Sequence, residues 1–216
     1  PMIVQVMKRA AEAAIGPVVV AAAERQIADA VIAAGGRAVL TRAGHPSGSD
    51  RVWEALGAVD PQGKHDAVIN LQGDLPTIGP DVIRAVLGPL AERNVDIATL
   101  VAEITDDAEG IDPNVVKAVL SIRPGEDIGR ALYFSRAPVP SSGTLYHHIG
   151  IYAFRPRALR RFVDIPPGGL EKTERLEQLR ALENGMRIDA ARVDTVPLGV
   201  DTPADLERAR EILSAR

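Results

Sequence analysis

The sequence predicts an α/β fold with a mostly parallel central sheet, helices on both faces and a mixed-sheet lobe. Over the first hundred residues, short apolar runs alternate with segments of helical spacing, which is typical of βαβ units. Several of these runs are continuously apolar, as strands covered on both faces are. After about residue 96, strand-like segments follow one another with short or irregular links, which favours mixed or antiparallel pairing.

The first half of the chain begins with a helix, because Ile3, Val6, Met7 and Ala10 recur on one helical face. A later helical segment stops at Gly35-Gly36, which is a C-terminal signal. In chain order we expect a helix at 2–14, a strand at 17–22, a helix at 24–34, a strand at 37–41, a polar loop at 42–49, a helix from about 50, a strand at 67–71 and a helix at 80–93.

The second half reads differently, because its strand-like segments are not separated by regular helices. We expect strands at 96–104, 115–122, 131–135, 148–154 and 187–193, and helices at 156–163, at 170–184 and from Pro203. We found neither an internal repeat nor a linker. The pattern therefore indicates a single domain over 1–216, with a mixed-sheet lobe at about 125–185.

Composition restricts the class of protein. The chain has 216 residues, enough to bury roughly 70% of the unfolded surface without disulfides or metal staples. It contains no cysteine, which excludes disulfides and cysteine-ligated metals. A net charge of −4 gives no basic footprint for nucleic acid, and no apolar run approaches the ~20 residues of a membrane span. We expect a cytoplasmic protein that binds neither nucleic acid nor membranes. Aromatic residues are only 3%, so we expect a core of Val, Ile, Leu and Ala.

Two aspartates carry the clearest chemical signal. Asp74 and Asp201 each end a run of β-type residues and are followed by a proline two positions later. Open α/β sheets bind their ligands at the carboxyl ends of strands. Two carboxylates brought together there would suit a hard cation that keeps waters and contacts a phosphate chain. The alternative is structural, since Asp-x-Pro is also a good helix start with Asp as the cap.

The phosphate-binding element is not of a common type. Neither Gly-x-x-x-x-Gly-Lys-Ser/Thr nor Gly-x-Gly-x-x-Gly occurs in the sequence, and residue 1 leads almost directly into a helix. A parallel α/β fold normally begins with a strand, and the turn after it holds the phosphate loop. The loop is therefore of another kind or belongs to a segment before residue 1.

Seven segments, taken in order, resemble the 3-deoxy-manno-octulosonate (Kdo) cytidylyltransferases, the CMP-Kdo synthetases of Gram-negative bacteria. They are Lys-Arg-Ala at 8–10, Thr-Arg-Ala-Gly-His-Pro-Ser-Gly-Ser-Asp-Arg at 41–51, Asn-Leu-Gln-Gly-Asp at 70–74, Ala-Leu-Tyr-Phe-Ser-Arg at 131–136, His-Ile-Gly-Ile-Tyr at 148–152, Leu-Glu-Gln-Leu-Arg at 176–180 and Gly-Val-Asp-Thr-Pro at 199–203. The resemblance spans the whole chain. The strand end at 71–74 alone would indicate only the wider sugar-nucleotidyltransferase group.

The resemblance implies a Rossmann-like nucleotide-diphospho-sugar transferase fold and a homodimer formed through the mixed-sheet lobe. It implies transfer of CMP from CTP to Kdo, with Mg²⁺ as cofactor and pyrophosphate as product, for lipopolysaccharide synthesis. The metal ligands implied are Asp74 and Asp201, with Gln72 near the reacting centre. The residues implied on the CTP side are Arg42, Ser47, Gly48 and Arg51. The residues implied around the sugar acid are Arg136, His148, Tyr152, Glu177 and Gln178.

Each of these assignments has a plainer alternative. A strand tyrosine such as Tyr152 is often simple packing, and the charge-rich segment 171–180 has the spacing of a solvated helix face. His148 is preferred over His147 because alternation along a strand places it opposite the apolar face. Arg42 and Arg51 lie beside a helix N-terminus, whose dipole disfavours cations unless an anion is present. We expect that anion to be phosphate.

The chain departs from the family pattern in several places. The family normally opens with a strand and a loop rich in Arg and Lys, so we expect the natural protein to be longer by roughly 25 residues. Gly44, Leu75 and Ala22-Ala23 replace residues that are usual in the family, which weakens the expected base specificity most. Two alternatives therefore stay open: another sugar-acid nucleotidyltransferase, and an N-terminally truncated, catalytically inactive binding protein.

Overall fold

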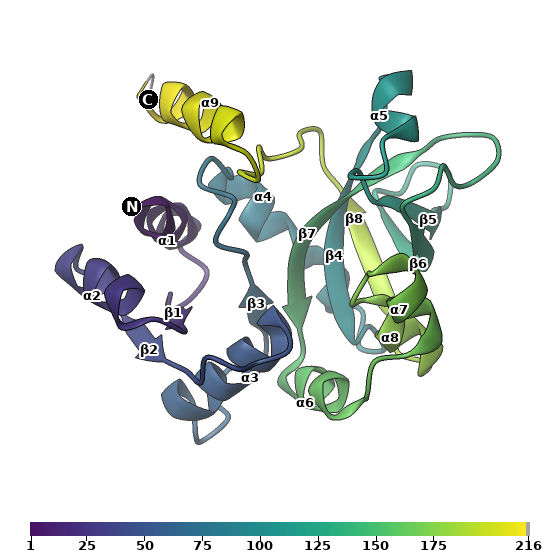
Figure 1. Ribbon diagram of the computed structural model, residues 1–216. Helices are drawn as coiled ribbons and strands as arrows, with labels where there is room; N and C mark the ends of the chain where they lie inside the picture. The colour runs from purple at the N-terminus through teal and green to yellow at the C-terminus, as the bar shows by residue number, and fades with distance from the viewer. Residues whose placement is uncertain (215–216) are drawn as a thin grey trace. The chain divides into compact units, whose positions relative to one another are not determined.

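Strands and helices alternate through the first part of the chain, as the sequence predicts. The computed structural model describes residues 1–214 (Figure 1). The elements up to residue 91 are α1 (Met2–Glu12), β1 (Val20–Ala22), α2 (Arg25–Ala33), β2 (Ala38–Leu40), α3 (Gly48–Val59), β3 (Val68–Asn70), α4 (Pro80–Ala85) and the 3-10 helix η1 (Gly88–Ala91). Each expected strand in this part of the chain is present, although β1 and β2 are only three residues long.

The chain divides into two compact units. Unit 1 comprises Pro1–His65, Asn70–Arg84 and the residues from Pro197 onward, and unit 2 comprises Asp66–Ile69 and Ala85–Val196. Unit 2 contains the residues 125–185 that the sequence assigns to a mixed-sheet lobe. The single-domain organisation predicted from the sequence stays a prediction.

Unit 1 is built around a small apolar cluster. Val4 and Met7 of α1 pack against Val20 of β1 and Val31 of α2. The strands β1 and β2 pair in parallel, and α2 is the crossover between them (Figure 1). The crossover has no room for a side chain at Gly36, where an added Cβ would lie 2.0 Å from Met7 Sδ. Gly36 of the glycine pair is therefore favoured by packing, whereas Gly35 is favoured by its left-handed φ of 81°.

Unit 2 carries the larger sheet. Its elements are β4 (Ile97–Glu103), α5 (Asp107–Ile111), β5 (Lys117–Ser121), β6 (Ile128–Ser135), β7 (Tyr146–Phe154), α6 (Pro156–Asp164), α7 (Gly169–Glu174), α8 (Leu179–Glu183) and β8 (Ile188–Arg192). Within the described residues the strand order is β3-β7-β4-β8-β6-β5. The strand β5 also pairs with β7, through Lys117 and His147, so that β7, β4, β8, β6 and β5 close into a ring.

The prediction of a mostly parallel sheet fails in unit 2. The pair β4–β8 is parallel, whereas β4–β7, β5–β6, β5–β7 and β6–β8 are antiparallel. The short links read from the sequence explain this, because antiparallel neighbours need only a short turn and parallel neighbours need a crossover. The mixed pairing expected for the second half is confirmed.

The core of unit 2 surrounds β4, from which only the last residue is exposed. All three phenylalanines of the chain, Phe134, Phe154 and Phe162, are buried there. The ring centroids of Phe154 and Phe162 lie 5.8 Å apart, which joins α6 to β7 (Figure 1). The prediction of a purely aliphatic core is therefore wrong for unit 2, although the total aromatic content is low.

Two predicted helices are interrupted. The segment 80–93 forms α4 and then η1, because Pro89 cannot donate the backbone hydrogen bond of a continuing α-helix. The segment 170–184 forms α7 and α8, separated at Arg175, which has the left-handed φ of 57°. The short helix α5 was not expected. The closing helix α9 (Pro203–Ser214) begins where the sequence predicts. Across residues 1–214, we find no helix with the length and apolar character of a membrane span.

The packing of β4 predicts a large loss of stability on truncation. Leu100, in the middle of β4, has no exposed surface. Leu100→Ala should lower the free energy of unfolding by about 2–5 kcal/mol, since it leaves a cavity that the surrounding ring of strands cannot fill. Leu132→Ala is the matched control, because Leu132 on β6 is 54% exposed; we expect a change within about 0.5 kcal/mol. Chemical denaturation of the three proteins tests this, and equal losses would contradict the assigned core.

Candidate functional site

The two aspartates singled out in the sequence lie close together in unit 1. The backbone N–H of Val200 donates to the carbonyl of Asp74 at 2.9 Å, which joins two segments far apart in the chain. Burial raises the pKa of the Asp74 carboxyl above its usual range, and the neighbouring negative charge of Asp201 raises this pKa further. Asp74 is half-buried and Asp201 is exposed. The convergence predicted from the sequence is therefore present.

The alternative role of these aspartates as helix caps is not observed. The helix α9 is capped by Thr202, whose Oγ1 accepts from the backbone N of Asp205 at 3.2 Å. Asp205 in return accepts from the backbone N of Thr202 at 2.9 Å, which completes a reciprocal cap. The helix α4 begins at Pro80, well beyond Asp74. Neither carboxylate of the pair is thus required to start a helix.

One oxygen of the Asp74 carboxylate has no hydrogen-bond partner among residues 1–214. This oxygen, Oδ1, is buried and accepts no hydrogen bond in the structure. A buried charged acceptor without a partner is costly, and a second carboxylate nearby increases the cost. Over residues 1–214 there is no group of three or more His, Cys, Asp or Glu side chains suited to a metal ion. Two carboxylates fit a cation such as Mg²⁺, which keeps several waters and takes further oxygen ligands from a substrate.

The polar loop after β2 leads into α3, where the residues expected to contact a nucleotide are found. Ser47 is the N-cap of α3, and its Oγ accepts from the backbone N of Asp50 at 3.3 Å. A Cβ added to Gly48 would lie 3.4 Å from Gln72 Nε2, so that the start of the helix faces Gln72. Gln72 Nε2 donates to Asn70 Oδ1 at 3.2 Å. The structure therefore brings Ser47, Gly48 and Gln72 to one place.

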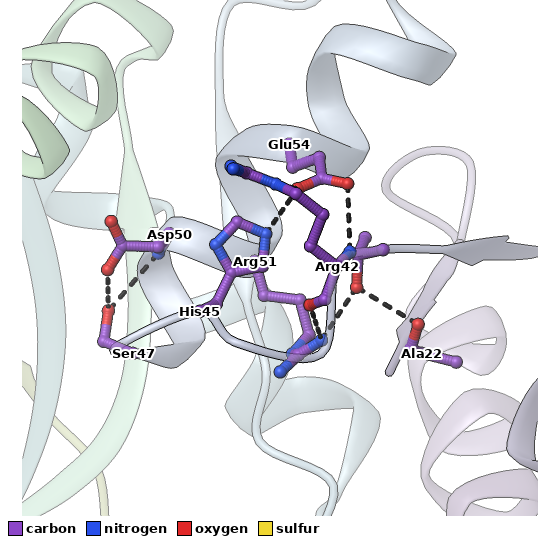
Figure 2. Close-up of polar contacts among 8 residues, drawn as sticks. Ala22, Arg42, His45, Ser47, Asp50, Arg51 and Glu54 are labelled. Atoms are coloured by element: carbon purple, nitrogen blue, oxygen red, sulfur yellow. Dashed lines mark hydrogen bonds and ion pairs between the residues drawn. The ribbon is translucent and has the colours of Figure 1, made fainter. Parts of the chain in front are cut away.

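Arg42 is held by a carboxylate that the sequence did not single out (Figure 2). Its backbone N and its Nε donate to the two oxygens of Glu54, at 3.1 and 2.9 Å. His45 Nε2 lies 2.5 Å from Glu54 Oε2, and the imidazole is buried. The hydrogen bonds from Arg42, with a further contribution from His45, hold the pKa of Glu54 at about 2. Glu54 thus fixes the loop 42–45 and the stem of Arg42 at neutral pH.

The outer end of Arg42 stays available to a ligand. The side chain is 80% exposed, and of its guanidinium N–H groups only Nε donates a hydrogen bond to another described residue. Arg51 instead turns inward, where its Nη1 donates to Thr41 Oγ1 at 2.8 Å and to the Arg42 carbonyl at 3.1 Å (Figure 2). The sequence indicates a bound phosphate, because it places two cations beside a helix N-terminus. That inference is weaker than expected, because Glu54 already supplies an anion beside Arg42.

Unit 2 contains the residues expected around the sugar acid, and two of them, His148 and Gln178, are buried. His148 Nε2 lies 2.9 Å from Thr99 Oγ1 on β4. The Thr99 hydroxyl has one proton and is within 2.9 Å of the Ile151 carbonyl. If that proton goes to the carbonyl, Nε2 of His148 donates to Thr99 and Nδ1 is left as an acceptor. Burial lowers the pKa of His148 to about 3, with a smaller contribution from His147. The imidazole is therefore neutral at pH 7.

A bulge in β7 sets His148 beside Tyr152. The register with β4 shifts between Thr99, which pairs with Tyr152, and Leu100, which pairs with Ile149. This shift brings the rings of His148 and Tyr152 to a centroid separation of 5.5 Å. Bulges re-aim side chains in this way and are frequent next to functional sites. Burial, together with the charge of Glu177, raises the pKa of Tyr152, so the phenol keeps its proton.

Arg136 follows β6 directly and is anchored on three sides. Its backbone N donates to Glu174 Oε2 at 3.1 Å, its Nε to the Glu174 carbonyl at 3.1 Å, and its Nη1 to the Pro113 carbonyl at 3.0 Å. Glu174 also accepts from Ser135 Oγ at 3.0 Å and from Tyr133 OH at 3.2 Å. Three of the five guanidinium N–H donors remain for a ligand, and a carboxylate can use two of them at once.

The charge-rich segment 171–180 is not the solvated helix face that its spacing indicates. Glu177 is half-buried and Gln178 is buried at the start of α8. Arg180 is buried, donates to both oxygens of Glu171 and stacks over the Phe162 ring at 5.0 Å. Much of the charge in this segment is therefore paired inside unit 2. The structure brings Glu177 near Tyr152, as the electrostatic effect on that phenol indicates.

Sequence reasoning missed Glu54, His45 and Glu174. Ser47, Arg51 and Glu54 recur at helical spacing on α3, and this shared face is a signal that could have found Glu54. His45 lies in the polar loop without any pattern of its own. Glu174 looks like one of several exposed helix charges, because its partners Ser135 and Arg136 are distant in sequence.

The chain is similar to known cytidylyltransferases over its whole length. A family model described as Cytidylyltransferase matches residues 1–188. The 3-deoxy-manno-octulosonate cytidylyltransferase of Paramagnetospirillum magneticum is 64% identical over 216 residues, which cover 100% of this chain and 88% of the relative. The protein of the same name from Rhodospirillum centenum is 65% identical over 217 residues, with coverages of 100% and 84%.

A solved structure of CMP:2-keto-3-deoxy-manno-octonic acid synthetase complexed with CTP matches this chain with a TM-score of 0.89. The sequences are 38% identical, and the match covers 100% of this chain and 88% of the other.

Burial of His148 predicts a pH dependence of stability. Because the folded pKa is about 3 and the ordinary value is 6.5, the unfolded chain binds the proton first. The stability associated with the neutral imidazole is complete above pH 6.5 and decreases as the pH falls toward 3. His148→Asn should remove this part of the slope, whereas His65→Asn, which removes an exposed histidine, should leave it in place. Denaturant titrations at several pH values measure it; parallel curves for wild type and His148→Asn would contradict it.

Proposed function

The chain belongs to the cytidylyltransferase family, among the Kdo cytidylyltransferases, and from this we propose that it transfers CMP from CTP to Kdo and releases pyrophosphate. The observation that carries the proposal is an identity above 60% to these enzymes along the entire chain. The reaction class also agrees with the residues present. Nucleotidyl transfer needs alignment and neutralisation of phosphate charge more than covalent chemistry from the protein.

On the nucleotide side we propose Arg42, Ser47, Gly48 and Arg51 as CTP-binding residues, with Gln72 near the reacting phosphate. Support comes from the exposed guanidinium of Arg42 and from the start of α3, where the first backbone N–H groups have no partner within the helix. Arg51 acts from behind by holding Thr41 and the Arg42 carbonyl. Unit 1 would thus present the outer end of the Arg42 guanidinium and a helix start to the triphosphate.

We propose that Asp74 and Asp201 hold Mg²⁺. The support is the buried, unpartnered Oδ1 of Asp74 and the repulsion between the two carboxylates. When bound, Mg²⁺ would neutralise charge on phosphate oxygens and favour ionisation of the incoming hydroxyl. The raised pKa of Asp74 is a property of the pair without a cation, and a bound cation favours the ionised form. The protein's own part is to hold both carboxylates at one place, through the Val200 to Asp74 backbone bond.

On the sugar-acid side we propose Arg136, His148, Tyr152, Glu177 and Gln178 as the Kdo-binding residues. Arg136 suits the carboxylate of Kdo because three of its N–H donors are unused. His148 suits a sugar hydroxyl, which could donate to Nδ1. A base works best when its pKa lies near the operating pH. With a pKa of about 3, His148 is a weak base at neutral pH, so we assign it to orientation rather than to proton removal.

We extend the proposal to the biological setting. We propose a Rossmann-like fold of the sugar-nucleotidyltransferase type, a homodimer formed through the lobe at 125–185, a cytoplasmic location and a role in lipopolysaccharide synthesis. The structural match to a CMP-Kdo synthetase supports the fold. The role in lipopolysaccharide synthesis is supported by the names of the relatives, which give Kdo as the sugar that receives the cytidylyl group.

Release of pyrophosphate tests the proposed function. The chain should release pyrophosphate from CTP only when Kdo and Mg²⁺ are both present, and little from UTP. The same assay on a version preceded by the expected strand and loop tests the alternative of an inactive binding protein. Release with another sugar acid, but not with Kdo, would replace the acceptor assignment. No release from either version with any nucleotide would overturn the enzyme assignment.

Removal of either carboxylate should abolish most of the activity. Asp74→Asn and Asp201→Asn should each lower kcat by at least about 100-fold, since charge stabilisation by a metal is worth several kcal/mol. Asp81→Asn is the control, because Asp81 is an exposed carboxylate of the same unit that pairs with Arg84. Steady-state rates over a Mg²⁺ titration measure the effect. A rate near that of wild type for either variant would remove its residue from the metal site.

Substitution of Glu54 should weaken the binding of CTP and leave the binding of Kdo nearly unchanged. Glu54→Gln keeps the shape of the side chain but loses the charge that orients Arg42 and contacts His45. We expect the KM for CTP to rise by about 10-fold, the loss of one charge-assisted hydrogen bond, with the KM for Kdo changed less than about twofold. Asp29→Asn, which removes an exposed pair with Arg25, is the control. An equal rise in both KM values would point to a general loss of structure.

A further inference from the structure

Unit 2 contains a lysine with no exposed surface. Lys117 is the first residue of β5, and its side chain is fully buried. Lysine is rarely buried unless its ammonium is paired or hydrogen-bonded. Its Nζ donates to the carbonyl of Asp112 at 2.8 Å and to the carbonyl of Val115 at 2.7 Å. In the sequence, Lys117 interrupts the otherwise apolar run 115–120.

The two carbonyls are the ends of one turn. The backbone N of Val115 donates to the Asp112 carbonyl at 3.2 Å, and the backbone N of Asn114 donates to Asp112 Oδ1 at 2.8 Å. The ammonium therefore closes the turn 112–115 from the inside of the unit. The carbonyl of Pro113, in the same turn, accepts a hydrogen bond from Arg136 Nη1 at 3.0 Å. Lys117 and Arg136 thus bind the same turn.

The turn is one of two supports for the Arg136 guanidinium. The other is the Glu174 carbonyl, which accepts from Nε at 3.1 Å. Two bonds from different nitrogens of a planar group fix the direction of the remaining N–H donors. A shift of the Pro113 carbonyl would leave Arg136 anchored only on its Nε side, free to rotate about that bond. The alignment of a planar fork with a carboxylate depends strongly on this direction.

The charges of two carboxylates and of Arg136 act on the ammonium of Lys117. The acidic groups facing it are Asp112 in the turn and Glu109 on α5, and Glu109 is itself paired with His147. Burial lowers the pKa of Lys117, while Asp112 and Glu109 oppose this and Arg136 adds to it. The two cations are therefore near enough to repel one another, which favours an anion at the exposed end of Arg136.

We propose that Lys117 is a positioning residue for recognition of the sugar acid: its buried ammonium fixes the turn 112–115, and the turn orients Arg136 toward the carboxylate. This inference rests on the proposed function of the chain. Lys117 does not contact the substrate, because no part of its side chain is exposed. Its location also joins the strands, since Lys117 pairs with Ser135 on β6 and with His147 on β7. The test must therefore separate positioning from support of the fold.

The first experiment compares Lys117→Met, which keeps the length of the side chain, with Lys117→Gln, which keeps a hydrogen-bond donor. Lys172→Met removes an exposed lysine of the same unit and is the matched control. We expect Lys117→Met to raise the KM for Kdo by about 10-fold, with the KM for CTP changed less than about twofold, and Lys117→Gln to recover part of the loss. Equal changes in both KM values, or no change in either, would overturn the proposal.

The second experiment asks whether Lys117 acts through Arg136. In the Arg136→Gln background, adding Lys117→Met should change the KM for Kdo less than about twofold, because the group that it positions is already gone. Independent, multiplicative effects would contradict the proposed link.

A third measurement needs no substrate. Amide hydrogen exchange should speed up at Asn114 and Val115 in Lys117→Met, while the amides of β4 keep the protection of wild type. Loss of protection throughout unit 2 would indicate a role in the fold alone. If the wild-type chain uses no Kdo, the proposed function fails by itself, and the exchange data still decide whether Lys117 holds the turn.

Discussion

One backbone hydrogen bond organises the region of unit 1 around Asp74 and Asp201. The Val200 N–H to Asp74 carbonyl bond holds the segment that ends in Asp201 against the segment that follows β3. The bond has an electrostatic cost, because it keeps two carboxylates together and one of them buries an oxygen without a donor. An unpaired buried acceptor costs about 1–3 kcal/mol, and more when it is charged. The cap of α9 is supplied by Thr202 and Asp205, so helix formation does not explain why Asp201 is placed there. The Mg²⁺ site that we propose for the two carboxylates would explain it.

Each unit contains an arginine that is anchored by one acidic residue. Arg42 in unit 1 and Arg136 in unit 2 each donate through the backbone N and through Nε to a single acidic residue, Glu54 and Glu174 respectively. In both cases Nε and the backbone N are anchored and N–H donors at the outer end are left unused, although Arg136 has a further anchor from Nη1 to the Pro113 carbonyl. A side chain fixed in this way loses less conformational entropy when it binds an anion. The similarity is physical and not a sequence repeat, since the anchoring residue follows Arg42 by twelve positions and Arg136 by thirty-eight.

The sequence predicted the strands better than the helices or the pairing. Apolar runs define β4 and β8 closely, because strands buried on both faces need an unbroken run. The split between α7 and α8 was missed, since nothing local distinguishes Arg175, which adopts a left-handed φ. Alternation along β7 placed His148 opposite Ile149 and Ile151, whereas the structure buries all three. The bond between His148 and Thr99 depends on a bulge that only the paired strand reveals. The anchor Glu174 could not be assigned, because its partners Ser135 and Arg136 are distant in sequence and meet it only in the folded unit.

Burial in unit 2 affects its ionisable groups in a way that suits an acidic sugar. It lowers the pKa of His148 and raises that of Tyr152, so both side chains are neutral at pH 7. Neutral donors and acceptors can contact sugar hydroxyls without a counter-charge. A carboxylate, by contrast, needs a cation, and in the proposed assignment the guanidinium of Arg136, with its unused donors, supplies it. Lysine at this position would be a point charge that burial could neutralise, whereas arginine keeps its charge. The proposed roles of Arg136 at the ligand and of Lys117 in the interior agree with that difference, since the buried ammonium needs only two carbonyls and a ligand-binding guanidinium must stay charged.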